Sequence, residues 1–188
     1  MKKLVAVDLD GTLIDTTRVN FESYRLALEE IGLTATYEHF IAECFGKHYL
    51  DFLPILMGEA ATPESMEWIH ERKKELYASC IPYGRLNRGL FDILCALRKT
   101  GEWATAVVTT GSERNANEVL NAFGCGELFD VVITSADVSK NKPDPEGYLK
   151  AMDLFGVSPE NTMIFEDSST GIAAAKAAGA QVFVIENF

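Results

Sequence analysis

The chain has 188 residues, 47% hydrophobic and 24% charged, which is enough for one globular core with a small inserted module. Its formal net charge of -11 argues against a general affinity for nucleic acid or for anionic membranes. No apolar run approaches the roughly 20 residues of a membrane span, and no secretory signal is visible, so we expect a cytoplasmic protein.

Five short apolar runs predict the strands of the core. Each run is continuous rather than alternating, which is typical of strands buried on both faces of a parallel sheet. Helical patterns separate the later runs, so the sequence predicts an α/β fold, a Rossmann-like doubly wound parallel sheet of about five strands. The runs cover residues 4–7, 104–108, 131–133, 163–165 and 182–185.

The helices between the later runs carry recognisable end signals. Ser112 is expected to cap a helix that stops before Gly124. Asp144 and Pro145 read as the N-cap and first residue of the next helix. Further helices are predicted over 87–99 and 170–178.

The stretch between the first two runs, about 95 residues, is far longer than one crossover needs and has a helical pattern. One helix is predicted over 18–31, and Thr62 opens another that ends near Cys80, with Pro54 dividing the segment between them. We therefore predict an all-helical cap domain inserted into the core. The expected boundaries are 16–80 for the cap and 1–15 with 81–188 for the core.

Polar side chains follow four of the five apolar runs. In parallel α/β sheets, ligands bind beyond the carboxyl ends of the strands, so these side chains are expected to share one edge of the sheet. They are Asp8, Asp10, Thr109, Thr110, Lys142, Glu166 and Asp167.

Carboxylates crowded at one edge repel each other unless a cation neutralises them, and Mg²⁺ prefers carboxylate oxygens, water and phosphate. Lys142 adds positive charge, while the Thr109 hydroxyl and the helix start near Ser112 suit a phosphate group. Gly11 provides the positive φ that a tight turn after Asp10 requires. The composition of this edge predicts phosphoryl transfer.

These residues resemble the haloacid dehalogenase superfamily, in its branch of phosphoglycolate phosphatases and beta-phosphoglucomutases. The D-x-D-G-T motif stands at 8–12, a threonine follows the second strand at Thr109, and a lysine before proline stands at Lys142. An acidic pair occupies 166–167, and S-x-x-G follows it at 168–171. The inserted helices resemble the helical cap of that family.

The resemblance implies a two-step hydrolase mechanism. Asp8 would attack phosphorus and form an aspartyl-phosphate, and Asp10 would first protonate the leaving oxygen and then activate water. Thr109 and Lys142 would bind the transferring phosphoryl group, with Thr110 as the neighbouring alternative to Thr109. An acid at Asp10 also sets the chain apart from the dehalogenases of the superfamily.

The same resemblance implies a magnesium site. Its ligands would be Asp8, the backbone carbonyl of Asp10, and Asp167, with Glu166 binding the ion directly or supporting a ligand.

The predicted cap is harder to interpret. A turn containing Gly46 and Lys47 is interpreted either as a substrate-binding loop or as a solvated connection between helices. Residues 71–75 have the charge pattern of a solvated helix face. Four aromatic residues are expected in the core of the cap: Phe40, Phe45, Phe52 and Trp68.

Three functions compete. The leading one is a magnesium-dependent phosphatase acting on a small phosphorylated metabolite, such as phosphoglycolate, a sugar phosphate or a nucleotide monophosphate. The second is a sugar phosphomutase, although Asn20 and Tyr49 stand where related mutases carry a histidine and an arginine. The third is a catalytically silent regulatory protein on the same scaffold. We expect a monomer or a homodimer in each case.

Overall fold

The computed structural model describes residues 3–186 and residue 188. The chain forms two compact units, one made of Met1–Asp15 with Arg85–Phe188 and the other of Thr16–Gly84. The second segment of the core unit thus begins at Arg85, whereas the predicted core segment begins at 81. The intervening η2 (Ile81–Tyr83) is a short 3-10 helix that packs on helices of the second unit.

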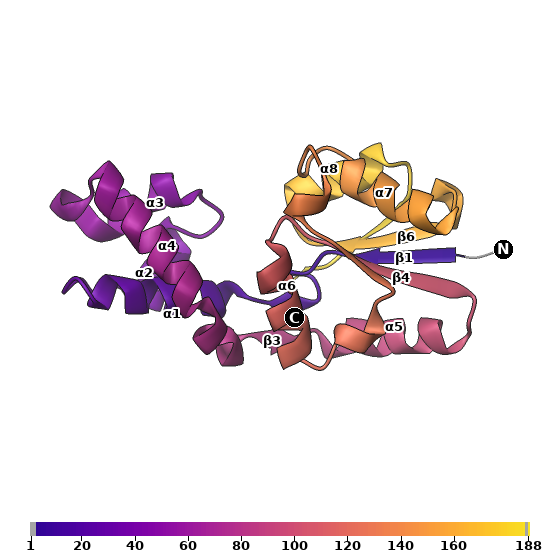
Figure 1. The fold of residues 1–188 in the computed structure, drawn as a ribbon, viewed down its shortest axis with the longest axis horizontal. Coiled ribbons are helices and arrows are strands. Elements are labelled where there is room, and N and C mark those ends of the chain that lie inside the picture. The colour runs from indigo at the N-terminus through magenta and orange to yellow at the C-terminus, as the bar shows by residue number, and fades with distance from the viewer. Residues whose placement is uncertain (1–2, 187) are drawn as a thin grey trace. The chain divides into compact units, whose positions relative to one another are not determined.

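The core unit is built on a five-stranded parallel sheet in the order β5–β4–β1–β6–β7 (Figure 1). Leu4 of the central strand pairs with Ala104 on one side and with Thr162 on the other. The predicted fold class is confirmed. The strands are β1 (Lys3–Val7), β4 (Trp103–Val108), β5 (Val131–Ile133), β6 (Thr162–Glu166) and β7 (Gln181–Val184).

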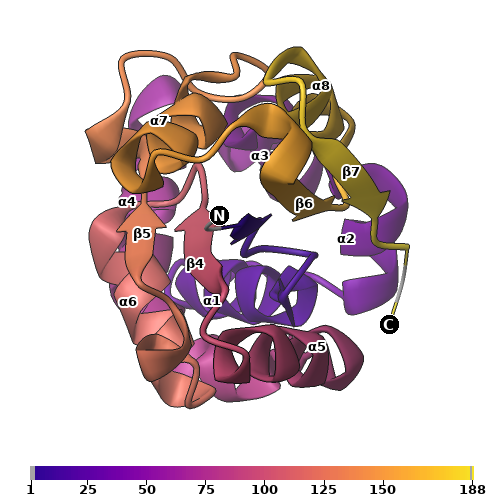
Figure 2. The same ribbon diagram turned by 90° about the vertical axis from the view of Figure 1, so that its right-hand side faces the viewer.

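Helices cover both faces of this sheet, as Figure 2 shows, with α7 and α8 on one face and α5 and α6 on the other. One buried apolar cluster joins the sheet to α7 and α8, and its members include Leu4, Ile164 and Ala174. The four helices are α5 (Arg88–Lys99), α6 (Glu113–Ala122), α7 (Glu146–Phe155) and α8 (Ser169–Ala177).

Side-chain caps fix where three of these helices begin. Asn87, Ser112 and Ser168 each accept a hydrogen bond from a backbone N–H in the first turn of the following helix. The expected cap at Asp144 is one residue out of place, because Pro145 takes the N-cap position and α7 begins at Glu146. The Asp144 carboxylate still accepts from the Glu146 N–H at 3.1 Å.

A small ribbon lies where the chain leaves and re-enters the core unit. β2 (Ile14–Asp15) pairs antiparallel with β3 (Arg85–Leu86), and each strand has two residues. The sequence pattern does not predict this ribbon, because two residues are too few to show a periodic pattern.

The second unit contains four α-helices among its described residues, where the sequence pattern predicted two. Pro54 lies inside α3 rather than between helices, which contradicts the prediction. Burial of Phe52, Leu53 and Met57 on that helix offsets the backbone hydrogen bond that proline cannot donate. The helices are α1 (Thr17–Glu29), α2 (Tyr37–Glu43), α3 (Tyr49–Met57) and α4 (Pro63–Cys80).

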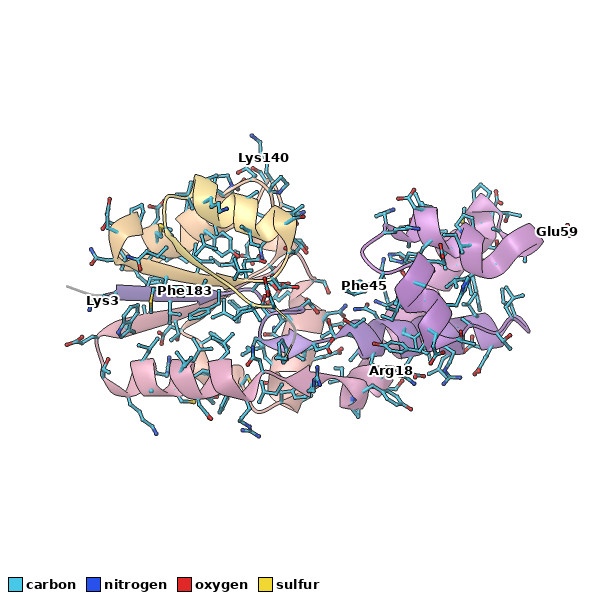
Figure 3. The ribbon with its side chains drawn as sticks, turned by 180° about the vertical axis from the view of Figure 1, so that it is seen from behind. Lys3, Arg18, Phe45, Glu59, Lys140 and Phe183 are labelled. Carbon is cyan, nitrogen blue, oxygen red and sulfur yellow. The ribbon has the colours of Figure 1, made fainter. Side chains whose placement is uncertain are left out.

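Aromatic and aliphatic side chains together form the apolar interior of the helical unit. Phe40 and Phe52 belong to it as predicted, with their ring centroids 5.7 Å apart. Phe45 and Trp68 do not, since they are 59% and 45% exposed. Figure 3 shows Phe45 on this unit, next to the turn that precedes α3.

Lys73 departs from the solvated helix face that the charge pattern predicted. It is buried, donates to the Asn20 side chain at 2.7 Å, and lies over the ring of Tyr77. A charge pattern cannot separate this lysine from its exposed neighbours, because burial depends on which helix packs against each side.

Within the described residues, no helix combines the length and the apolar character that a membrane crossing requires.

A half-buried polar feature of the helical unit surrounds His70. Its Nδ1 lies 2.8 Å from the Tyr24 hydroxyl, and the Tyr49 ring stacks on the imidazole at 3.8 Å. The pKa of His70 is lowered from 6.5 to about 4, mainly by burial and also by the charges of Lys74 and Lys73, while Glu71 and Glu67 oppose the shift.

The pKa of His70 predicts a pH-dependent stability. Because the unfolded chain binds a proton near pH 6.5 and the folded chain only near pH 4, stability is lost as pH falls through that interval. Urea unfolding at pH 7 and pH 4.5 should show a smaller loss for His70→Gln than for wild type. The exposed His39→Gln serves as control; equal losses in all three proteins would contradict the prediction.

Candidate active site

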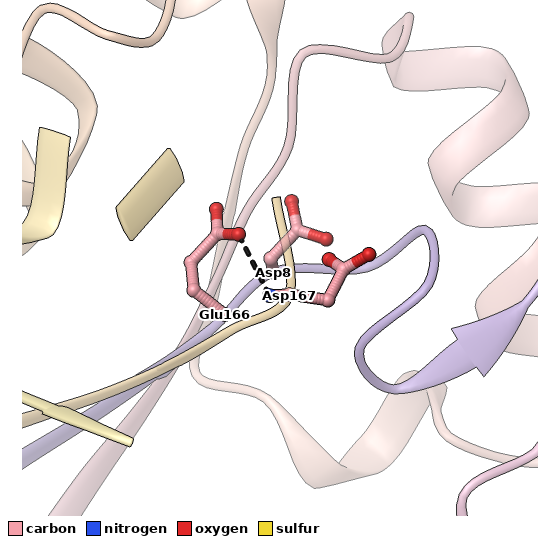
Figure 4. Close-up of side chains that lie close together, drawn as sticks. All are labelled: Asp8, Glu166 and Asp167. Carbon is pink, nitrogen blue, oxygen red and sulfur yellow. Dashed lines mark hydrogen bonds between the residues drawn. The ribbon is translucent and has the colours of Figure 1, made fainter. Parts of the chain in front are cut away.

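The carboxyl ends of the central strands bring the predicted carboxylates together. Asp8 follows β1 directly, Glu166 ends the neighbouring β6, and Asp167 comes next. One carboxylate oxygen from each lies within 4.8 Å of the others, and Figure 4 shows the three groups converging. Asp8 and Glu166 are buried and Asp167 is half-buried.

Burial raises the pKa values of two carboxylates in this cluster, Asp8 and Asp167. Burial raises the pKa of Asp8 well above the range of an ordinary aspartate; Lys142 offsets part of this effect, while Glu166 and Asp10 add to it. Burial also raises the pKa of Asp167, although a hydrogen bond from Thr12 opposes the shift. A bound cation would relieve both groups.

The ammonium of Lys142 is the buried positive charge beside Asp8. It donates to Asp8 Oδ1 at 2.6 Å, to Glu166 Oε1 at 2.6 Å and to the Val108 carbonyl at 2.9 Å. Burial lowers the pKa of Lys142, but the charges of Asp8 and Glu166 outweigh this effect and raise the pKa overall. The group is therefore a fixed cation whose three hydrogens all have acceptors.

Glu166 is fully buried, and protein donors surround its carboxylate. Oε1 accepts from Lys142 and from the Tyr148 hydroxyl at 2.9 Å. Oε2 accepts from the N–H groups of Asp167 and Ser168 and from the Ser168 hydroxyl. With five donors already in place, Glu166 is better suited to holding its neighbours than to binding an ion itself.

Two residues of the D-x-D-G-T motif, Gly11 and Thr12, lie against Asp167. The Thr12 hydroxyl donates to Asp167 Oδ1 at 2.8 Å. Gly11 has a φ of +90°, as the sequence analysis expected, and a Cβ there would stand 2.2 Å from Asp167 Oδ2. The close approach of the Gly11 backbone is a second reason for glycine, and the motif alone does not reveal it.

Thr109 and Asp10 lie together at the end of β4. The Thr109 hydroxyl lies 3.4 Å from Asp10 Oδ2 and accepts from the Gly111 N–H at 3.0 Å. Thr109 is buried, whereas Thr110 is exposed. The carboxylate of Asp10 does not belong to the cluster of Asp8 and its two acidic neighbours among the described residues.

Gly46 and Lys47 lie in the helical unit, in the turn between α2 and α3. Gly46 has a φ of +78°, and the Lys47 ammonium donates to the Glu43 carbonyl at 2.5 Å. Asn20 accepts from Lys73, and the Tyr49 hydroxyl donates to Glu67. A substrate-binding role for this turn remains a prediction.

Two residues of the site, Tyr148 and Gly171, were not predicted to contact it. Tyr148 occupies a core position of α7, where an aromatic residue gives no functional signal. A Cβ on Gly171 would stand 1.7 Å from Glu166 Oε1, so only glycine fits there without moving the carboxylate. Gly171 is the glycine of the S-x-x-G motif, but only the structure shows why glycine is required at this position.

The donor set fits a hard divalent cation. It consists of carboxylate oxygens, without histidine or cysteine, and its carboxylates outnumber the single ammonium. Asp8 and Asp167 are the members best placed to bind such an ion, because Glu166 is already saturated with donors.

A parallel α/β sheet with a buried lysine and a carboxylate cluster suited to a divalent cation at its carboxyl edge defines an enzyme core suited to phosphate chemistry. The sequence profile of haloacid dehalogenase-like hydrolases matches residues 5–185. The chain belongs to this family, which confirms the resemblance and the expected hydrolase class.

Individual relatives match along most of their length. A phosphorylated carbohydrates phosphatase from Thermotoga maritima is 34% identical over 179 residues, covering 93% of this chain and 81% of that protein. A validoxylamine A 7'-phosphate phosphatase from Streptomyces hygroscopicus subsp. limoneus is 32% identical over 180 residues, covering 95% and 83%. The solved structure of a "putative beta-phosphoglucomutase" from Thermotoga maritima has a TM-score of 0.81 at 31% identity, covering 100% and 87%.

A Gly11→Ala substitution tests the geometry around Asp167. The left-handed backbone should cost about 1–2 kcal/mol of stability, and the new methyl group should displace the Asp167 carboxylate and weaken Mg²⁺ binding. Urea unfolding in EDTA and calorimetric Mg²⁺ titration would measure the two effects.

The matched control is Gly32→Ala, because Gly32 has a φ of +78° but nothing within 4 Å of its added Cβ. It should lose similar stability and keep its Mg²⁺ affinity. Unchanged Mg²⁺ binding in Gly11→Ala would show that Gly11 serves the backbone alone.

Proposed function

We propose that the protein is a magnesium-dependent phosphatase that hydrolyses small phosphorylated metabolites through a phosphorylated Asp8. The observation that carries this proposal is the 2.6 Å contact between the Lys142 ammonium and Asp8 Oδ1 inside a buried carboxylate cluster. A lysine held there favours the ionised form of the buried Asp8 carboxylate, and it is positioned to neutralise charge on a phosphoryl group bound to that carboxylate.

The chemistry balances in two steps. An Asp8 oxygen attacks phosphorus, the bond from phosphorus to the leaving oxygen breaks, and Asp10 gives that oxygen a proton. Asp10 then takes a proton from water, whose oxygen attacks phosphorus and releases inorganic phosphate and the Asp8 carboxylate. Thr109, beside Asp10, supplies a hydroxyl for the transferring group.

Magnesium would be held by Asp8, by Asp167 and by the backbone carbonyl of Asp10, and it would neutralise the charge of the phosphoryl oxygens. Glu166 would position these groups, because its carboxylate accepts hydrogen bonds from the Asp167 N–H and from the Lys142 ammonium.

The relatives point to the substrate class. Two of them are named as phosphatases of a phosphorylated carbohydrate and of validoxylamine A 7'-phosphate, so a phosphate ester of a small polyhydroxylated compound is the class we favour. We propose that the helical unit is the cap domain of this enzyme and that Gly46 and Lys47 contribute to substrate binding. We place the reaction in the cytoplasm, in a monomer or a homodimer.

The likeness to the "putative beta-phosphoglucomutase" supports a mutase as the second candidate. A mutase must return its phosphoryl group to a sugar instead of to water. Conversion of a hexose 1-phosphate that depends on a hexose bisphosphate primer, without net phosphate release, would establish this alternative.

Asp8→Asn should abolish turnover, because an amide cannot form the phosphoenzyme. We expect hydrolysis of p-nitrophenyl phosphate with Mg²⁺ by wild type, its loss in EDTA, and a fall of about 10³-fold or more in the variant. Asp92→Asn, at an exposed position of α5, is the control and should match wild type. Turnover retained in Asp8→Asn would eliminate Asp8 as the nucleophile.

Asp10→Asn separates acid-base catalysis from metal binding. It should lower kcat for an alkyl phosphate by about 10²- to 10⁴-fold, and less for p-nitrophenyl phosphate, whose leaving group needs little protonation. Its Mg²⁺ affinity should stay near that of wild type because only the backbone of Asp10 is proposed as a ligand. An equal loss on both esters would count against the acid role.

A further inference from the structure

The side chain of Tyr148 contacts both partners of the ion pair between Lys142 and Glu166. Tyr148 is 1% exposed near the start of α7, and its hydroxyl donates to Glu166 Oε1 at 2.9 Å. The Lys142 ammonium, which donates to the same oxygen at 2.6 Å, lies 5.2 Å from the centroid of the Tyr148 ring. No step of the proposed reaction uses this residue.

We propose that Tyr148 is a positioning residue that directs the Lys142 ammonium toward Asp8. This inference rests on the proposed function, in which Lys142 assists phosphoryl transfer at Asp8. On this proposal, the Tyr148 hydroxyl assists the reaction, whereas a purely structural role would need only the buried ring.

Two carboxylates compete for the Lys142 ammonium. Asp8 Oδ1 and Glu166 Oε1 both lie 2.6 Å from the Lys142 nitrogen, so two carboxylates share one cation. A second donor on Glu166 Oε1 satisfies part of that oxygen's charge and weakens its hold on Lys142. The Tyr148 hydroxyl is that donor, so its presence favours the contact with Asp8.

The ring of Tyr148 gives the ammonium a second constraint. The face of an aromatic ring attracts a cation within about 6 Å of its centroid, and the attraction strengthens where water is excluded. Lys142 is therefore bounded by two carboxylates, the Val108 carbonyl and an aromatic face.

Two glycines place Tyr148 and close the space around its acceptor. A Cβ on Gly147 would stand 2.8 Å from the Val108 side chain, so this glycine lets the start of α7 approach β4 closely. Gly171 lies close against the Glu166 carboxylate, since an added Cβ there would stand 1.7 Å from Oε1. The Glu166 carboxylate is thereby held in the orientation that Tyr148 and Lys142 share.

The test is Tyr148→Phe, which keeps the ring and removes the donor. With p-nitrophenyl phosphate and saturating Mg²⁺, we expect kcat to fall about tenfold to hundredfold, as for the loss of one hydrogen bond to a charged group, with KM changed less than about threefold. Tyr24→Phe is the matched control, since Tyr24 is also buried and hydrogen-bonded, in the helical unit. It should retain the kcat of wild type.

A double-mutant cycle distinguishes positioning from a general loss of structure. If Tyr148 acts through Lys142, Tyr148→Phe should have no further effect on single-turnover phosphate release in the Lys142→Ala background. The same fold-loss in both backgrounds would overturn the inference. Should Tyr148→Phe not fold, Gly171→Ala displaces the same Glu166 oxygen and must show the same dependence on Lys142.

The activity of the wild type distinguishes a failure of the proposed phosphatase function from a failure of the proposed role of Tyr148. An active wild type with an equally active Tyr148→Phe would overturn the role of Tyr148 and leave the phosphatase standing. A folded, Mg²⁺-loaded wild type that hydrolyses no phosphate ester would overturn the proposed function and this inference with it.

Discussion

The ammonium of Lys142, shared between Asp8 and Glu166, is the interaction on which the rest of the site depends. A buried carboxylate without a partner takes up a proton, and a protonated Asp8 is a poor nucleophile. One lysine cannot balance three acidic groups, so the pKa of Asp8 stays raised despite Lys142, and a bound cation would lower it. Charge balance therefore connects the proposed nucleophile Asp8, the candidate cation site and Lys142, the lysine proposed to bind the phosphoryl group.

The fold provides that balance through the order of its strands. β1 lies at the centre with β4 and β6 on either side, so the residues that follow these three strands converge at one edge. Lys142 reaches the same edge from the loop before α7, where its ammonium donates to the carbonyl at the end of β4. Glycine at positions 11, 147 and 171 permits backbone approaches that any other residue would obstruct.

The sequence predicted most of the core because its strands are buried on both faces and appear as uninterrupted apolar runs. The candidate site could be predicted because the polar residues that follow those runs stand out against them. The helical unit was predicted less well: α2 and α3 were missed, Pro54 was taken as a break, and Phe45 and Trp68 were assigned to the core. These features depend on contacts between helices, which local patterns do not contain. Tyr148 lay beyond prediction for the same reason, since only the folded chain shows what its hydroxyl contacts.

The two-residue ribbon of β2 and β3 has a consequence for how such a chain changes over time. The pairing of β2 with β3 holds the chain side by side where it leaves and re-enters the core. The core can therefore accommodate inserted segments of different length and sequence at this point. The entropy of closing a connecting loop rises only slowly with its length. If the helical unit is the substrate-binding cap, as proposed, this segment is an exchangeable module in which selection can reshape substrate preference without altering the edge of the sheet that carries the carboxylates.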